Sequence, residues 1–133
     1  MFRKLAEADK PNKKLLGRIK RARANLGWIS GLEALAKSLI QKGLKKIIIT
    51  LGEKGLFYTD GKEEIFIEAT KVKAIDTIGA GDAFNGGFAY ALLQKKPIKE
   101  ALIFANKVAG LSTTKQGAGN AMPSLEEVNK LTN

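Results

Sequence analysis

The spacing of hydrophobic residues predicts a helix followed by a strand near the start of the readable part of the chain. Ser30 is predicted to be the N-cap of a helix, after which apolar residues recur at helical spacing as far as Ile40, and Gly43 is typical of a helix end. Residues 45–52 form a short, β-branched apolar run closed by a glycine, which predicts a buried strand. A helix, a glycine and an apolar strand in this order favour an α/β unit with a parallel strand.

The middle of the chain predicts a hairpin and then a strand that leads into a helix. Residues 56–59 and 64–68 are strand-like runs on either side of Asp60-Gly61, a dipeptide that strongly favours a β-hairpin. Residues 72–75 predict another short strand, and periodic apolar positions predict a helix over residues 82–94.

Two more helices are predicted toward the end of the chain. One opens at Pro97, because proline is tolerated in a first helical turn. The other is capped by Ser124, with Glu127 completing a capping box. The elements together predict an α/β fold: a layered, Rossmann-like sheet of mostly parallel strands with flanking helices, plus a β-hairpin.

Composition excludes several classes of function. The chain has 133 residues, of which 44% are apolar, so it has the size and the core of one domain. It has no cysteine and no histidine, which excludes disulfides, Cys/His metal sites, cysteine nucleophiles and histidine-based triads. No apolar run approaches the roughly 20 residues of a membrane helix, and no secretory signal is evident. We therefore expect a cytoplasmic protein.

Positive charge is concentrated at the beginning of the chain. Residues 1–24 carry nine basic and two acidic residues, whereas the rest of the chain carries 14 basic and 11 acidic residues. The net charge of +10 is thus mostly a property of a basic, atypical head, residues 1–30, within which residues 13–25 can be drawn as a helix. Such a head could bind nucleic acid or an anionic surface.

The segment from Asp76 to Asp82 carries the candidate chemistry. Gly79 and Gly81 lie in a predicted turn between a strand and a helix, where backbone N–H groups can point at an anion. Asp82, at the helix N-terminus, could accept a proton from a hydroxyl. An anion hole beside a carboxylate base suits phosphoryl transfer. A Gly-Ala-Gly-Asp tetrapeptide alone is weak evidence, since many helices begin with Gly and Asp for capping.

The surrounding sequence is far more specific. Residues 76–89 closely resemble the signature of the ribokinase-like (PfkB) family of carbohydrate kinases, and three further segments match in order: 48–55, 104–109 and 112–123. The resemblance covers roughly residues 31–131. It implies that residues 31–133 are a partial ribokinase-like fold, the C-terminal nucleotide-binding portion of such a kinase.

The resemblance implies roles for particular residues. Asp82 would be the catalytic base, and the backbone amides of Gly79, Ala80 and Gly81 would hold the transferring phosphate. ATP and Mg²⁺ are the implied cofactors, with K⁺ beside the anion hole. The implied nucleotide-binding residues are Thr50, Gly52, Gly55 and Asn106. The implied ligands of the monovalent cation are Asp76 and the backbone carbonyls of Ile78, Ser112, Lys115 and Gly117.

Some of these positions have simpler explanations. Thr50 could merely end a strand, Asn106 could be a solvated polar residue on a helix, and Asp76 could cap a turn. At Ala121 the family often supplies a serine oxygen, so this chain lacks one implied cation ligand.

Three functions are compatible with these features. The first is an ATP-dependent sugar kinase domain that transfers the γ-phosphate to a sugar hydroxyl but is weakly active or inactive alone, because the family's sugar-binding motif and β-lid are not found. The second is a catalytically silent nucleotide-binding module that self-associates or pairs with a missing N-terminal half. The third is a basic nucleic-acid-binding protein built on residues 1–24, against which the nearly neutral body and the absence of interleaved aromatic residues argue.

The head suggests one further hypothesis about the origin of its charge. Residues 9–12 resemble the start of the family's Pro-Asn-x-x-Glu segment, which helps to organise magnesium, but Lys13-Lys14-Leu15 stands where the glutamate should follow. Because the match resumes at about Gly31, we hypothesise that residues 13–30 are a frame-shifted or replaced stretch. Re-sequencing the encoding DNA tests this: a clean reading of residues 13–30, with no alternative frame that restores the glutamate, refutes it.

Overall fold

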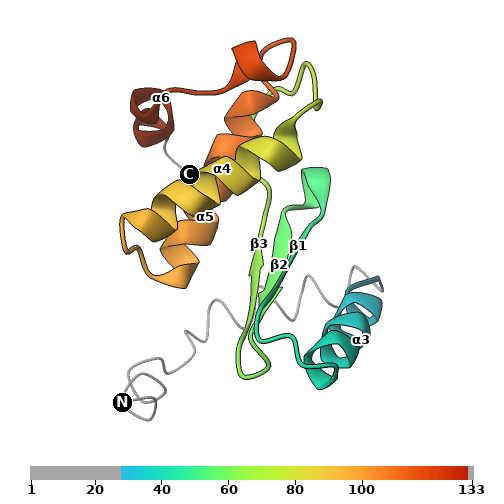
Figure 1. Cartoon of the computed structure of the whole chain (residues 1–133). Helices are drawn as coiled ribbons and strands as arrows, with labels where there is room; N and C mark the ends of the chain where they lie inside the picture. Colours follow the sequence, from blue (N-terminus) through green and yellow to red (C-terminus); the bar gives the residue numbers. More distant parts are fainter. Residues whose placement is uncertain (1–27, 132–133) are drawn as a thin grey trace. The chain divides into compact units, whose positions relative to one another are not determined.

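The computed structural model describes residues 28–131 and divides the chain into two parts, Met1–Ile47 and Ile48–Asn133, which are described separately (Figure 1). The first contains helix α3, Trp28–Gln41. The predicted end of this helix is confirmed: the amide of Gly43 donates to the carbonyl of Ile40 at 2.9 Å. Ser30 lies inside α3, so its prediction as the N-cap is wrong. The predicted helix over residues 13–25 and the rest of the basic head lie outside the described residues.

A three-stranded sheet with the order β1-β2-β3 begins at the junction of the two parts. Its strands are β1 (Ile47–Thr50), β2 (Leu56–Thr59) and β3 (Glu64–Ile67), and a short 3-10 turn, η1 (Gly52–Lys54), links the first two. The predicted hairpin is confirmed, because β2 and β3 pair antiparallel with Leu56 opposite Ile67. Asp60 Oδ1 closes its turn by accepting hydrogen bonds from the amides of Lys62 and Glu63, both at 2.9 Å.

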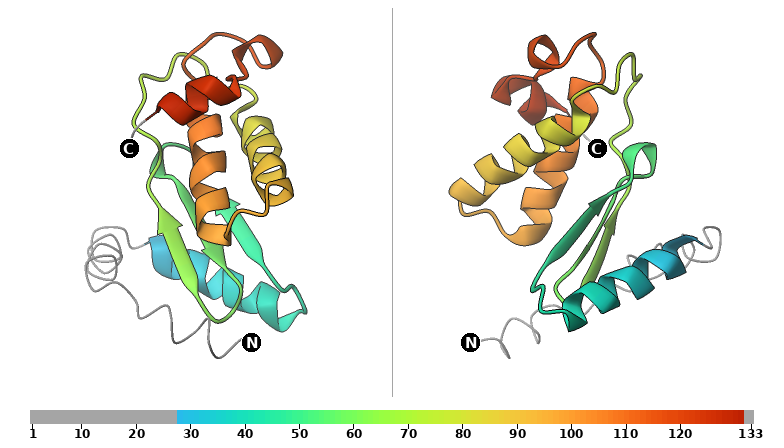
Figure 2. Two further views of the ribbon diagram at one scale, coloured as in Figure 1. Left: turned by 90° about the vertical axis from the view of Figure 1, so that its left-hand side faces the viewer. Right: turned by 45° about the vertical axis from the view of Figure 1, so that its right-hand side comes forward.

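Two long antiparallel helices cover one face of this sheet (Figure 2). They are α4 (Ala80–Leu93), which starts two residues before the predicted position, and α5 (Ile98–Ser112), for which Pro97 is the N-cap. A 3-10 turn, η2 (Gly119–Ala121), and the short helix α6 (Leu125–Lys130) follow. The predicted capping box of Ser124 and Glu127 is confirmed by reciprocal hydrogen bonds between the two residues. None of the described helices is long and apolar enough to span a bilayer.

The core lies between the sheet and the helix pair. Side chains from β2, β3, α4 and α5 meet in one buried cluster, which consists of Leu56, Tyr58, Ile65, Phe84, Leu102 and Ala105. Phe84 stacks on Phe88 with ring centroids 6.1 Å apart. Burial, with the nearby carboxylates of Asp60 and Glu63, raises the pKa of Tyr58. Ala83, Phe84, Gly87 and Ala91 are the buried residues of α4, whereas Leu92 is 47% exposed.

Mostly parallel strands are not found among residues 28–131. Residues 51–55 are far too few for the crossover that would place β1 and β2 parallel, and β2 pairs antiparallel with β3. The predicted strand at residues 72–75 is also wrong, since residues 72–74 have no regular secondary structure and residue 75 lies in a bend. The amide of Ile75 instead donates to the carbonyl of Thr113 at 2.7 Å, so the end of α5 takes the place of a neighbouring strand.

The two long helices approach each other most closely at Gly87. A Cβ at this position would lie 2.9 Å from Cβ and Cγ2 of Val108 and 3.2 Å from Cα of Ala105, whereas a Cβ at Gly86 would meet nothing within 4 Å. Two adjacent glycines in one helix therefore have different structural roles.

We expect opposite effects from alanine at these two positions. Gly86→Ala should raise the free energy of unfolding by about 0.5–1 kcal/mol, because alanine forms helix more readily than glycine. Gly87→Ala should lower it by about 1–3 kcal/mol, because the added methyl group overpacks the contact with Val108. Urea unfolding followed by circular dichroism measures both, and similar changes in the two variants would contradict this close packing at Gly87.

Candidate functional site

The candidate anion hole is the turn that opens α4. Gly79 is the N-cap of the helix and has a φ of 80°; a Cβ there would also lie 3.0 Å from Cβ of Ala118, so this position needs glycine. The amide of Ala80 donates a hydrogen bond to the carbonyl of Thr77 at 3.2 Å. Within the described part of the chain, the amides of Gly81 and Asp82 have no hydrogen-bond acceptor. Two N–H groups at a helix N-terminus can therefore receive an anion.

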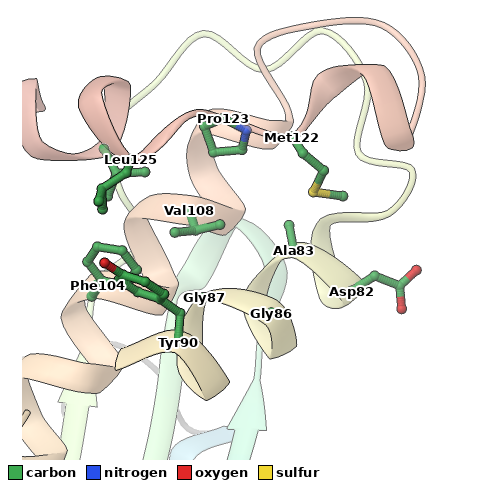
Figure 3. Close-up of a pocket in the computed structure, with 11 residues that line it drawn as sticks. Asp82, Ala83, Gly86, Gly87, Tyr90, Phe104, Val108, Met122, Pro123 and Leu125 are labelled. Atoms are coloured by element: carbon green, nitrogen blue, oxygen red, sulfur yellow. The ribbon is translucent and has the colours of Figure 1, made fainter. Parts of the chain in front are cut away.

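Asp82 stands beside these free amides. It lies in the first turn of α4, where the helix dipole favours a negative charge, and it is exposed. Figure 3 shows its carboxylate at the rim of a pocket, pointing away from the apolar lining. The structure thus places an accessible carboxylate next to the candidate anion hole, the arrangement that the sequence predicts for a proton acceptor.

Asp76 joins the turn before α4 to the loop after α5. Its Oδ1 accepts a hydrogen bond from the amide of Ile78, and its Oδ2 accepts one from the amide of Gly117, both at 3.0 Å. These two bonds hold the pKa of the Asp76 carboxyl below its ordinary value. Its own amide donates to the carbonyl of Thr113 at 3.0 Å. The prediction that Asp76 caps the turn is therefore confirmed. The same carboxylate also bonds to Gly117, which lies 41 residues later in the sequence.

The candidate cation ligands all lie on these two joined segments. Ile78 belongs to the turn that Asp76 caps, and Gly117 is bonded to Asp76 directly. Ser112 and Lys115 flank Thr113, whose carbonyl receives the amides of residues 75 and 76. Among residues 28–131, no three His, Cys, Asp or Glu side chains are grouped as for a multivalent metal. Backbone carbonyls with a single carboxylate are instead donors that suit a monovalent cation such as K⁺.

Two of the candidate nucleotide-binding residues meet at one stretch of backbone. Gly55, with a φ of 104°, lies against the chain after β3, where a Cβ would collide with the carbonyl of Ile67. Asn106 donates a hydrogen bond from Nδ2 to the carbonyl of Glu68 at 2.8 Å. Asn106 is therefore an anchored side chain on α5 rather than simply a solvated one.

The remaining two candidates lie in the turn after β1. Thr50 is exposed at the end of the strand, and Gly52 opens the 3-10 turn with a φ of 59°. Figures 1 and 2 show this turn at the same end of the sheet as the N-terminus of α4. One end of the fold thus presents both the candidate nucleotide-binding turn and the candidate anion hole.

One contributor to the site was not predicted from the sequence. Glu127 Oε1 accepts a hydrogen bond from Nζ of Lys115 at 2.9 Å, while Oε2 binds the amide of Ser124 at 2.7 Å. Glu127 therefore ties α6 to the loop that carries the candidate cation ligands. The capping box was visible in the sequence, but nothing in the local pattern indicates a partner 12 residues away.

Comparison with known proteins identifies the family. The model of the pfkB family of carbohydrate kinases matches residues 17–125. The chain belongs to this family. A deoxyribokinase from Salmonella typhi is 40% identical over 99 residues, which are 74% of this pfkB chain and 32% of that protein. A ribokinase from Bacillus subtilis is 45% identical over 86 residues, which are 65% of this chain and 29% of that protein.

Solved structures of pfkB proteins show the same likeness. A ribokinase from Thermotoga maritima superposes with a TM-score of 0.73 at 37% identity, over 83% of this chain and 37% of that protein. An Arabidopsis thaliana ribokinase complexed with ribose and ATP superposes with a TM-score of 0.68 at 34% identity, over 74% of this chain and 32% of that protein. The chain therefore has part of the ribokinase fold and spans about a third of the length of the curated relatives it matches.

The bond between Glu127 and Lys115 gives a testable pH dependence. The amide of Ser124 and the Lys115 ammonium lower the pKa of Glu127 from 4.5 to about 2. Because the pKa is lower in the folded state, its charge stabilises the fold above pH 4.5, and this contribution is lost as the pH falls toward 2. Glu127→Gln should therefore lower the Tm at pH 7, with a difference from wild type that shrinks over this range.

Glu126→Gln is the matched control for this measurement. Within the described residues, Glu126 pairs with the exposed Lys130 on the same helix, and such a pair contributes little. Thermal unfolding of the three proteins between pH 2 and pH 7 decides the question, and equal Tm losses in both variants would show that the Lys115 bond does not stabilise the fold.

Proposed function

We propose that this chain carries the nucleotide-binding and catalytic part of an ATP-dependent sugar kinase. The observation that carries the proposal is the start of α4, where the exposed Asp82 carboxylate stands beside the free amides of Gly81 and Asp82. Membership of the pfkB family supports a carbohydrate as the phosphoryl acceptor. The Arabidopsis thaliana ribokinase complex with ribose and ATP supports the same pair of substrates.

In the proposed reaction, a sugar hydroxyl oxygen attacks the γ-phosphorus of ATP. Its proton passes to an Asp82 carboxylate oxygen, the bond from phosphorus to the bridging oxygen breaks, and ADP leaves. The amides at the start of α4 hold the oxygens of the transferring phosphoryl group, where negative charge must be stabilised. Mg²⁺ bound to the phosphates would supply further positive charge. Glycine at position 79 is needed for this geometry because its φ of 80° turns the chain into the helix.

The nucleotide would lie along the end of the sheet. Thr50, Gly52 and Gly55 would line its phosphate and ribose side, and Asn106 would lie near its base. Asp76 and the carbonyls of Ile78, Ser112, Lys115 and Gly117 would hold K⁺ beside the anion hole. This cation would stiffen a turn that the two Asp76 hydrogen bonds already fix.

We further propose that the chain alone binds nucleotide with little or no turnover. The chain spans 32% of the length of a deoxyribokinase relative, and within the described residues Asp82 remains exposed to water. Closure that excludes water is usual in phosphoryl transfer. Residues 31–133 would then act as a nucleotide-binding unit that needs the rest of the kinase fold to phosphorylate a sugar.

Calorimetric titration of Mg-ATP into the purified chain in potassium buffer tests this function. We expect saturable binding that is retained in Asp82→Asn, because this residue acts on the sugar hydroxyl. Binding should weaken by about tenfold in Asn106→Ala, because the side chain that fixes the adenine side is lost.

Asn129→Ala provides the matched control, since Asn129 is exposed on α6 and should leave binding unchanged. Circular dichroism of each variant confirms that it is folded. The absence of binding heat from a folded wild-type chain would overturn the proposed nucleotide site.

A further inference from the structure

Lys115 lies in the middle of a short loop that Asp76 holds at both ends. The carbonyl of Thr113 accepts a hydrogen bond from the amide of Asp76, and the amide of Gly117 donates one to Asp76 Oδ2, both at 3.0 Å. Within the described part of the chain, the backbone amide and carbonyl of Lys115 make no hydrogen bond. The carbonyl of Lys115, one of the candidate cation ligands, is therefore free to accept a cation.

The side chain of Lys115 is bound to a different element, helix α6. Its Nζ donates a hydrogen bond to Oε1 of Glu127 at 2.9 Å, and the two side chains are 49% and 44% exposed. Oε2 of Glu127 accepts a hydrogen bond from the amide of Ser124 at 2.7 Å, so the capping box already fixes this carboxylate. Lys115 therefore meets a carboxylate whose position is set in advance, unlike the two flexible partners of an ordinary surface ion pair.

An ammonium group at this position acts against the binding of a cation. Lys115 is the only charged residue among residues 113–121, and the chain has a net charge of +10. Asp76 is the carboxylate that bonds to the backbone of this loop, and a lysine charge nearby would cancel part of its attraction for K⁺. The ion pair with Glu127 gives the Lys115 side chain a partner of opposite charge, so that the pair as a whole is nearly neutral toward the loop.

We propose that Glu127 is a positioning residue for the candidate K⁺ site, because it holds the Lys115 ammonium in an ion pair and so cancels the repulsion between this charge and the cation. The proposal rests on the cation site of the proposed function. It means that α6, on which no candidate cation ligand lies, sets the affinity of the loop for K⁺. Removal of either charge should leave the other one acting alone on the cation, so the two removals should have opposite effects.

The affinity for K⁺ can be measured without nucleotide and without catalysis. Thermal unfolding of the full chain is followed by circular dichroism at pH 7 while KCl replaces tetramethylammonium chloride at a constant ionic strength of about 0.1 M, where charges within about 10 Å still interact. A cation that binds the folded chain stabilises it by mass action, and the rise of the Tm with K⁺ concentration gives an apparent Kd. Each variant is compared with its own Tm in the absence of K⁺, so a change in basal stability cancels.

Single changes at the two charges carry the test. Glu127→Gln keeps an oxygen for the amide of Ser124 but removes the charge, and it should raise the apparent Kd for K⁺ by about two- to fivefold. Lys115→Gln should lower this Kd by a similar factor, because the Glu127 carboxylate then acts on the cation alone. The double variant should return close to wild type. The matched controls are Glu126→Gln and Lys130→Gln, which break a 2.7 Å ion pair within α6 and should leave the Kd unchanged.

Opposite changes in the two variants, with unchanged controls, support the proposal. It is overturned if both variants weaken K⁺ binding, since Glu127 would then act only as a mechanical tether of the loop. It is also overturned if neither variant differs from wild type or if the controls change as much. A wild-type chain that K⁺ does not stabilise overturns the proposal together with the cation site. Calorimetry with Mg-ATP reports separately on the nucleotide site, so failure of the proposed function is distinguished from failure of this inference.

Discussion

The two-sided hydrogen bonding of Asp76 is the constraint on which the candidate site depends. The turn before α4 has no strand to hold it, because residues 72–75 do not pair with the sheet. Its position comes from the end of α5 instead, through the Thr113 carbonyl and through the bond from the Gly117 amide to Asp76. Bonds to a carboxylate are stronger than neutral ones. One half-buried side chain thereby fixes the anion hole against the loop that carries the candidate cation ligands.

Close packing through small residues sets the position of α4 itself. Gly87 allows α4 to approach Val108, and Gly110 allows α5 to approach Thr70, where a Cβ would lie 2.9 Å from the threonine Cβ. Asn106 holds the same stretch of chain by its bond to Glu68. The helix that begins with the candidate base is therefore placed by backbone contact, which leaves little freedom for it to shift relative to the sheet.

Local signals in the sequence predicted the helices and the hairpin, but not which strands lie beside β1. Asp60-Gly61, Pro97 and the Ser124 capping box act within a few residues, and the structure confirms each of them. The apolar strand β1 suggested parallel neighbours because its composition is that of a buried strand. Which strands lie beside it depends on long-range pairing, and composition does not encode that. For the same reason the Lys115 partner of Glu127 could not be found from local patterns.

The glycines of α4 connect the candidate chemistry with the packing of the helix. A glycine inside a helix lowers its stability by about 1 kcal/mol relative to alanine, so each glycine needs a compensating gain, which is here called its offset. At Gly87 the offset is the contact with Val108, and at Gly81 it would be the approach of a phosphate to the backbone. Gly86 has no such offset within the described residues, because open space surrounds it. Gly86 therefore weakens the helix without a gain in packing, in contrast to Gly87, which is the next residue of the same helix.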